Sequence, residues 1–464
     1  MRITASILVT LALASNCSIA FSKDATLPIP PSGVIGTDEA MLSPEYWIAK
    51  APSPDSVLMS AAQIDAQNQR MFATDPSMYD LRKLGPSFTH AQVDAWITKL
   101  AKLRAPVLFD EHDRPIPESA IDDIKANLAL DRIPQSIAAH YGLVVQRVSL
   151  RNFPTALRAF PGKGLQDFDA FQESTLFPGD PVAIVHASRD GQWYFVVSPR
   201  YAAWVTRSAV AEGSRDQVLA YAQTSPYRVI TGDKVRTVYT PEAPQVSELQ
   251  LDMGTRIPLA QLPPDQPVNG QGPYEAWTLQ LPVRAPDGTL QFQPALLQRT
   301  ADSSPDYLPL TRANLIRQAF KFLGERYGWG HLYNGRDCSG FVSDVYRSMG
   351  VQLPRNTGDQ SKSPALHFRA FTGQDSHEAR MQAIAQTQVG DLIYIPGHVM
   401  MFLGRDHGQP YVIQDVGGLV FRDDAGKMRW TKTNEVSVTP LLPLLVSERL
   451  SYVDAMTSIV SVRP

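Results

Sequence analysis

Residues 336–342 read Arg-Asp-Cys-Ser-Gly-Phe-Val, and a histidine, His398, follows sixty residues after the cysteine, Cys338. The apolar spacing after Cys338 predicts a helix that begins at the cysteine and stops at Gly350. The free N–H groups and the dipole at a helix N-terminus lower a thiol pKa and can hold an oxyanion. His398, which is predicted to open a strand, can act as a base and then as an acid. These segments supply a nucleophile and its base, provided that the fold brings them together.

A third polar group usually orients such an imidazole, and Gln414 is the candidate. The run 411–414 is predicted to be a strand, and residues 405–409 are predicted to join it to the histidine strand as a hairpin. An amide oxygen can accept a hydrogen bond from one ring nitrogen and fix the tautomer. The alternative is that Gln414 is an ordinary solvated strand residue.

The N-terminus has the pattern of an export signal. Arg2 precedes the apolar run 7–14, which is too short to span a bilayer, and residues 18–20 form a small-x-small cleavage site. We therefore expect a signal peptide over 1–20; lipidation of Cys17 and an uncleaved anchor are the alternatives. After cleavage Cys338 is the only cysteine, so no intrachain disulfide can form, and Cys338 is either a buried small hydrophobe or a functional thiol.

The bulk composition is that of a globular chain with several domains. Its 464 residues are 44% hydrophobic and 19% charged, with a formal net charge of −3. The overall charge therefore gives no reason to expect binding to nucleic acid. No later run is long and apolar enough for a membrane span. Residues 377–381 begin like a zinc helix but lack the second histidine. We expect no metal and no nucleotide cofactor, and the sequence gives no oligomeric state.

Changes in composition and hydrophobic periodicity along the chain divide it into segments. After the signal, residues 21–135 read as a linker and a helical region, with Thr89 as the cap of one helix. Short β-like runs with turn signals then predict two small SH3-like barrels, over 136–212 and 213–305. Residues 306–464 mix helices and strands and are predicted to form an α+β domain. The strands expected in the two barrels are 143–148, 181–186, 193–197, 203–205, 229–231, 236–239, 256–259 and 276–279.

Five blocks in the last segment resemble, in order and spacing, the NlpC/P60 family of cysteine peptidases. They are 327–330 (Tyr-Gly-Trp-Gly), 337–342, 353–357 (Leu-Pro-Arg-Asn-Thr), 390–393 (Gly-Asp-Leu-Ile) and 397–399 (Gly-His-Val). The upstream arrangement resembles the subgroup in which a helical segment and two bacterial SH3-like domains precede the catalytic domain. This resemblance implies a multidomain protein with a papain-like α+β catalytic domain.

The resemblance also implies a function: an exported hydrolase of the periplasm or cell envelope that cuts peptidoglycan stem peptides or muropeptides. The typical bond lies between γ-D-glutamate and a diamino acid. By motif position, Cys338 is the nucleophile, His398 the base and Gln414 the third residue. The substrate-binding residues implied are Tyr327, Asp337, Ser339 and Asn356, together with Tyr201 of the first SH3-like domain. In this subgroup the first SH3-like domain narrows the cleft, so that only stems with a free N-terminal L-Ala fit.

Two positions depart from the family pattern. Gln414 stands where histidine is common, and Asn356 stands where an acidic residue often holds the substrate ammonium. These departures keep two alternatives open: a weak or inactive peptidoglycan-binding protein, and an acyl transferase or amidase with another substrate.

Overall fold

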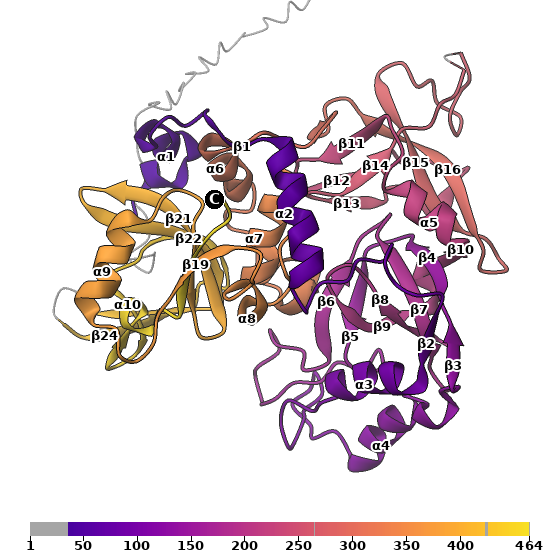
Figure 1. Ribbon diagram of the computed structural model, residues 1–464, viewed down its shortest axis with the longest axis horizontal. Coiled ribbons are helices and arrows are strands. Elements are labelled where there is room, and N and C mark those ends of the chain that lie inside the picture. The colour runs from indigo at the N-terminus through magenta and orange to yellow at the C-terminus, as the bar shows by residue number, and fades with distance from the viewer. Residues whose placement is uncertain (1–35, 264, 423–425, 464) are drawn as a thin grey trace, which may run out of the picture.

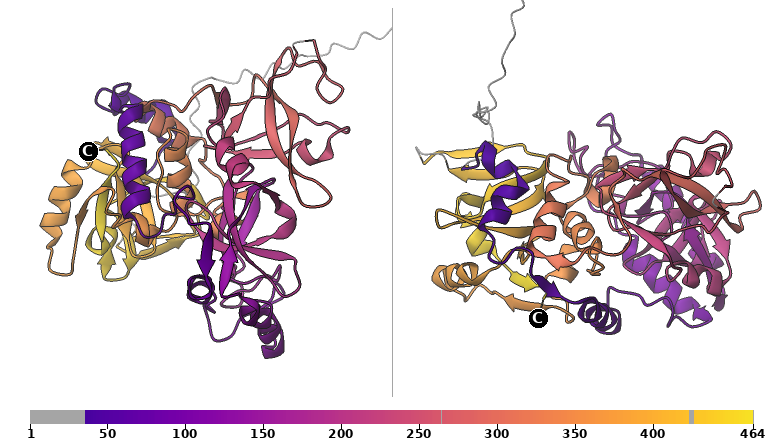
Figure 2. Two further views of the ribbon diagram at one scale, coloured as in Figure 1. Left: turned by 45° about the vertical axis from the view of Figure 1, so that its right-hand side comes forward. Right: turned by 90° about the horizontal axis from the view of Figure 1, so that it is seen from above.

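The computed structural model describes residues 36–263, 265–422 and 426–463. The predicted signal segment and Cys17 lie outside the described residues. We call residues 136–212 the first β domain, 213–305 the second β domain and 306–464 the C-terminal domain. The C-terminal domain lies at one end of the molecule and the two β domains lie at the other, with helix α2 (Ala61–Thr74) along the boundary (Figure 1). Figure 2 shows this division from two further sides. Within the described ranges, no helix is long and apolar enough to cross a membrane.

The N-terminal region is helical, as predicted. Ser60 and Thr89 each cap a helix through a capping box, in which the hydroxyl and the third residue's amide satisfy free N–H groups reciprocally. The predicted cap at Thr89 is therefore confirmed. Besides α2, the elements are α1 (Pro44–Lys50), β1 (Val57–Met59), β2 (Ser87–Thr89), α3 (His90–Leu100) and α4 (Glu118–Ala126).

These helices divide between two hydrophobic cores. Trp47 of α1 and Met71 of α2 are fully buried in the core of the C-terminal domain. Val93 and Ile97 of α3 are fully buried in the core of the first β domain. The N-terminal region thus links the C-terminal domain to the first β domain, because burial of a large apolar side chain contributes about 1.5–3 kcal/mol.

The first β domain is a seven-stranded antiparallel sheet in the order β10-β4-β7-β8-β9-β5-β6. Trp193 and Trp204 are buried in its core, as predicted. The predicted single strand over 143–148 is wrong: the sheet breaks at 145–147, where the Arg147 side chain reaches Asp252 of the second β domain. The strands of this sheet are β4 (His140–Val144), β5 (Val148–Arg151), β6 (Gln172–Leu176), β7 (Pro181–Ala187), β8 (Trp193–Val197), β9 (Ala202–Thr206) and β10 (Val210–Gly213). A further strand, β3 (Ser136–Ala138), pairs with β2 instead.

The second β domain is built from smaller pieces. It contains one short helix, a three-stranded sheet in the order β14-β11-β17, and two hairpins, β12–β13 and the long β15–β16. Its prediction as a second SH3-like barrel stays a prediction. The elements are α5 (Arg215–Tyr221), β11 (Tyr227–Ile230), β12 (Lys234–Arg236), β13 (Gln250–Asp252), β14 (Arg256–Pro258), β15 (Ala276–Arg284), β16 (Leu290–Gln298) and β17 (Ser303–Ser304).

The C-terminal domain has a six-stranded antiparallel sheet in the order β19-β28-β20-β21-β22-β25. One face packs on α6 (Arg312–Phe320) and α7 (Cys338–Arg347), and the other packs on α9 (His377–Gln386) and α10 (Tyr452–Ala455). The sheet strands are β19 (His367–Ala370), β20 (Leu392–Ile395), β21 (His398–Asp406), β22 (Gln409–Val416), β25 (Glu435–Pro440) and β28 (Ser458–Ser461).

The rest of this domain is peripheral to that sheet. Helix α8 (Thr357–Gln360) follows α7, and the two-residue strand β18 (Leu310–Thr311) pairs with β1. A separate four-stranded sheet consists of β23 (Leu419–Arg422), β24 (Met428–Thr431), β26 (Leu444–Ser447) and β27 (Leu450–Ser451). The sequence predicted α7 to begin at Cys338 and β21 to begin at His398, and both starts are confirmed.

Candidate active site

Cys338 opens helix α7, where Asp337 is the N-cap and accepts the Gly340 N–H at 2.8 Å. Cys338 is 6% exposed, and the backbone N–H of Val399 lies near its sulfur, where it favours the thiolate. Burial, followed by the charge of Asp337, raises the pKa of the Cys338 thiol to about 12, and Val399 and Arg355 oppose that shift only in part. At neutral pH the sulfur is therefore a protonated thiol that needs a base to become a nucleophile.

His398 opens β21, one residue before the N–H that contacts the sulfur. Its Nε2 lies 2.7 Å from Oε1 of Gln414, and Nε2 of Gln414 donates to Oγ1 of Thr439 at 2.7 Å. Because an amide oxygen only accepts, Nε2 of the ring carries the proton and Nδ1 keeps its lone pair. Burial lowers the pKa of His398, and the Gln414 hydrogen bond partly opposes that effect. The arrangement is a neutral imidazole with a free basic nitrogen.

The predicted hairpin brings Gln414 to His398. Met401 of β21 lies opposite Ile413 of β22, and a bulge follows between Phe402 and Gly404. Counted back from Met401, His398 lies diagonally across from Gln414, on the same face of the sheet. The predicted contact is therefore present, and Gln414 is fully buried rather than solvated.

Asp337 and Ser339, on either side of the cysteine, are held by one arginine. Arg355 donates to Asp337 Oδ2 at 2.7 Å, to Ser339 Oγ at 2.9 Å and to Ser174 Oγ of the first β domain at 2.7 Å. Both predicted residues are nearly buried, at 6% and 4% exposure. Their contacts fix the turn that carries Cys338.

The three remaining predicted residues differ in their contacts. Tyr327 is half-buried beside it: burial, followed by the charge of Cys338, raises the Tyr327 pKa. Tyr201 donates to Glu173 Oε2 at 2.6 Å. Glu173 precedes Ser174, whose hydroxyl accepts from Arg355 and so connects Tyr201 indirectly to the Cys338 turn. The Asn356 side chain is exposed and donates to Asp359 at 3.1 Å, not to any of the other predicted residues.

Sequence reasoning missed several residues of the site. Arg355 stands within a quoted motif block, which was a usable signal, whereas Thr439 and Glu173 come from distant strands with no local signal. Glu173 is bound by Tyr201 and, from the N-terminal region, by Arg104. Asp415 is fully buried with no hydrogen bond to either carboxylate oxygen, and burial raises its pKa well above the usual range. Asp415 also acts on the thiol, since its charge raises the pKa of Cys338.

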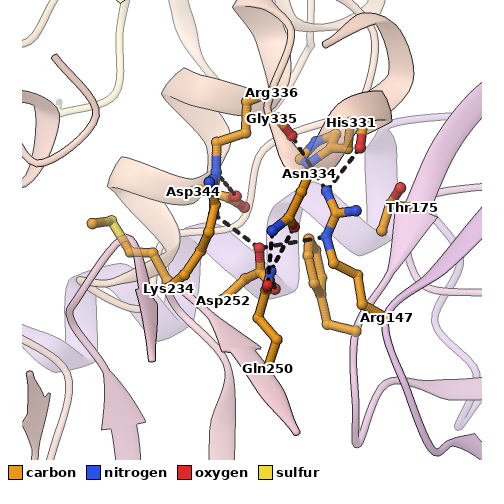
Figure 3. Close-up of polar contacts among 12 residues, drawn as sticks. Arg147, Thr175, Lys234, Gln250, Asp252, His331, Asn334, Gly335, Arg336 and Asp344 are labelled. Atoms are coloured by element: carbon orange, nitrogen blue, oxygen red, sulfur yellow. Dashed lines mark hydrogen bonds and ion pairs between the residues drawn. The ribbon is translucent and has the colours of Figure 1, made fainter. Parts of the chain in front are cut away.

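A buried cluster of charges lies directly behind the cysteine turn. The Arg336 side chain is fully buried and binds Asp344 at 2.8 Å, Glu325 at 3.0 Å and Asp252 of the second β domain at 3.1 Å. Arg147 of the first β domain approaches Asp252 at 3.5 Å, as Figure 3 shows, and Lys234 of the second binds Glu325. We call these six residues the charge cluster. It holds three cations and three anions, so the burial of each charge is compensated.

Family models match two parts of the chain. The NlpC/P60 family model matches residues 324–437, and a model described as an SH3 domain of the SH3b1 type matches residues 157–206. The chain thus carries an NlpC/P60 domain, preceded by an SH3 domain and a helical N-terminal segment. The predicted mixed multidomain architecture is confirmed in these respects.

Similar proteins agree with this assignment. A γ-D-glutamyl-L-lysine dipeptidyl-peptidase of Bacillus cereus is 27% identical over 211 residues, which are 41% of this chain and 54% of that protein. Its namesake from Bacillus subtilis is 39% identical over 54 residues, 11% of this chain and 18% of that protein. The chain thus spans about half or less of these relatives. An NlpC/P60 endopeptidase from Photobacterium damselae subsp. piscicida has the same fold, with a TM-score of 0.69 at 16% identity, over 90% of this chain and 96% of that one.

Proposed function

We propose that the protein is a cysteine endopeptidase that cuts peptidoglycan stem peptides in the cell envelope, between γ-D-glutamate and a diamino acid. The observation that carries the proposal is the buried thiol of Cys338 at a helix N-terminus, against Val399, with the His398–Gln414–Thr439 chain beside it. The substrate class follows from the names of the two Bacillus relatives and from the NlpC/P60 domain.

The reaction starts from a protonated Cys338 thiol and a neutral His398 imidazole. Nδ1 of His398 takes the thiol proton as the sulfur of Cys338 attacks the γ-glutamyl carbonyl, which forms a tetrahedral oxyanion. The N–H groups of the first turn of α7 are the candidate donors to that oxyanion. The imidazolium then protonates the departing amine, and a water molecule, deprotonated by His398, releases the acid product from the thioester.

The first β domain supports recognition of a free substrate amine. Glu173 is a carboxylate next to Ser174, which Arg355 ties to the Cys338 turn. Its two oxygens already accept from Tyr201 and Arg104, and each keeps a further lone pair for an ammonium group. Glu173 then has the role that the exposed Asn356 does not fill.

One experiment tests the reaction. The purified protein is incubated with L-Ala-γ-D-Glu-meso-diaminopimelate and with the same peptide on its sugar, and released diamino acid is measured by mass spectrometry. We expect release from the free peptide, and none from the Cys338→Ala variant. Release that is unchanged in Cys338→Ala rejects the thiol mechanism. Release from the sugar-linked stem as fast as from the free one rejects the amine requirement.

A second candidate function is a stem-peptide-binding protein without turnover. The observation that favours it is the thiol pKa of about 12 with only 6% of the residue exposed, which leaves few thiolates at neutral pH. A folded protein that binds the tripeptide by calorimetry but releases nothing supports this candidate over the peptidase.

A further inference from the structure

A cavity lies away from Cys338, where α2, both β domains and the C-terminal end of α7 meet. Its volume is about 550 Å³, within the range of small-molecule sites. Neither Cys338 nor His398 lines it. It shares with the candidate active site only the wall formed by Ser174, Tyr201 and Arg355.

Five arginines and three aspartates line this cavity. Two of the arginines are already paired, since Arg82 binds Asp80 at 2.9 Å and Arg355 binds Asp337 at 2.7 Å. The other three, Arg200, Arg256 and Arg347, come from three different parts of the fold.

Each of these three arginines has at least one donor without an acceptor, although Nη2 of Arg256 donates to the Thr224 carbonyl at 2.8 Å and Nη2 of Arg347 donates to the Met253 carbonyl at 2.7 Å. Arg200 makes no hydrogen bond or ion pair with any residue that the structure describes. Nη1 of Arg256 and Nε of Arg347 are buried and have no hydrogen-bond partner. The carboxylate nearest to that Nε is Asp344 at 4.0 Å, and Arg336 already binds it. Guanidinium donors left unsatisfied in a protein interior cost free energy unless an acceptor enters.

Nearby carboxylates, Asp344 and Asp180, offset the positive charge at Arg200 only in part. Burial, followed by the charge of Arg347, lowers the pKa of Arg200 to about 10. The acid near Arg200 in the cavity wall is Asp180; burial raises its pKa, and it accepts the Phe177 N–H at 2.9 Å. Arg256 and Arg347 act on the same wall residue, Tyr307, and both lower its pKa against the effect of burial.

We propose that this cavity is a binding site for a small organic anion, with its carboxylate or phosphate held by Arg200, Arg256 and Arg347. Carboxylate and phosphate oxygens match the planar guanidinium fork and accept its donors in pairs. The apolar part of the ligand packs on side chains of the cavity wall such as Phe72, Leu81 and Leu176. The site is separate from the peptide-cleaving site and does not depend on it.

The test measures binding directly, by calorimetry and ligand-observed NMR on the wild-type chain. The probes are N-acetyl-L-leucine, phenyl phosphate and the uncharged N-acetyl-L-leucine amide. We expect at least one acid to bind at millimolar concentration or below, and the amide not to bind. Which acid binds more tightly distinguishes a carboxylate from a phosphate ligand.

Variants then locate the site. Arg200→Gln is expected to weaken the acid about tenfold or more, as loss of a charge-assisted hydrogen bond does. Arg207→Gln is the matched control, because Arg207 is exposed in the same domain and does not line the cavity. Arg256→Lys, which keeps the charge but loses the fork, serves as a second variant if Arg200→Gln unfolds.

Three results overturn the proposal. They are no binding of either acid at millimolar concentration, equal binding of acid and amide, and an unchanged affinity in folded Arg200→Gln or Arg256→Lys. Since no readout involves turnover, failure here leaves the proposed peptidase activity untouched, and failure of that activity leaves this site standing.

Discussion

The two β domains hold the cysteine turn in chemically different ways. Strand β6 of the first domain contacts it largely through neutral hydrogen bonds: Gln172 with Gly330 at 2.8 Å and with Trp329 at 3.0 Å, and Ser174 with Arg355. The second domain contributes two charges, Asp252 and Lys234, to the charge cluster behind the turn, and the first domain contributes one, Arg147. Neutral contacts can be lost one at a time, whereas a buried charge left alone is costly. Strand β6 is therefore suited to shaping the cleft, and the charge cluster, to which the second domain contributes Asp252, is suited to fixing the turn.

The largest expected effect comes from removing one charge of the second domain. Asp252→Asn leaves three cations against two anions in the charge cluster, so we expect the free energy of unfolding to fall by about 3–5 kcal/mol. Urea unfolding measures it. The control is Asp302→Asn: Asp302 pairs across the same boundary with Lys321 at 3.0 Å, but the side chains are 62% and 30% exposed. That change should cost less than about 1 kcal/mol; equal losses in the two variants contradict the comparison.

Next in size is the orientation of the base, which involves neither β domain. Gln414→Ala removes the acceptor that fixes Nε2–H of His398, so we expect kcat to fall about tenfold to a hundredfold with KM little changed. Steady-state kinetics on the free tripeptide measure both constants. Thr439→Val, which removes only the outer hydrogen bond, should show a smaller loss in the same direction. A rise in KM without a loss in kcat means that Gln414 serves binding instead.

The first domain is expected to act on KM. Glu173→Gln keeps the shape of the side chain but removes the negative charge available to a substrate ammonium, so KM should rise about tenfold with kcat little changed. The matched substrate is the same tripeptide with an acetylated N-terminus, on which wild type and variant should behave alike. A stability loss as large as that of Asp252→Asn would erase the distinction between the domains.

The smallest effect concerns His331, which lies between the domains: its ring is 5.8 Å from that of Phe177, and Arg147 donates to its carbonyl. Burial lowers its pKa well below 6.5, so below pH 6.5 the unfolded chain binds a proton that the folded chain does not. Stability should therefore fall with acid by up to about 1.4 kcal/mol per pH unit from this residue, until the folded pKa is reached.

Urea unfolding between pH 7 and pH 5 checks this slope. In His331→Gln, the slope of the unfolding free energy against pH should decrease by the contribution of about one proton. His407→Gln, in which the side chain replaced is 92% exposed, should leave the slope as it is. An identical slope in wild type and His331→Gln shows that the buried ring does not control acid stability.

Much of the fold around the site was predictable, because its signals are local. The helix start at Cys338, the strand start at His398 and the hairpin that leads to Gln414 follow from apolar spacing and turn residues within a few positions. The break at 145–147 was missed because a run of β-formers continues through it. At the break, the Arg147 side chain reaches Asp252, a carboxylate more than a hundred positions later, and no local pattern announces that contact.

The candidate site was predictable in its chemistry but only partly in its membership. Motif spacing pointed to Cys338 and His398, and strand pairing pointed to Gln414. The sequence could not indicate Glu173 or Asp252 as members of the site. An acidic residue in a strand gives the same sequence pattern whether it faces water or a buried arginine. Likewise, the helical pattern of the N-terminal region predicts a buried face but not that Trp47 enters the core of the C-terminal domain.

The sequence by itself determined where helices and strands start and which reactive groups stand at their ends, because caps, turns and periodicity act between residues close in the chain. Only the tertiary structure decided that the thiol is protonated, that three charges from the β domains close a cluster behind it, and that three arginines meet around a cavity. Burial and electrostatic balance depend on everything packed nearby, and those neighbours come from distant parts of the chain.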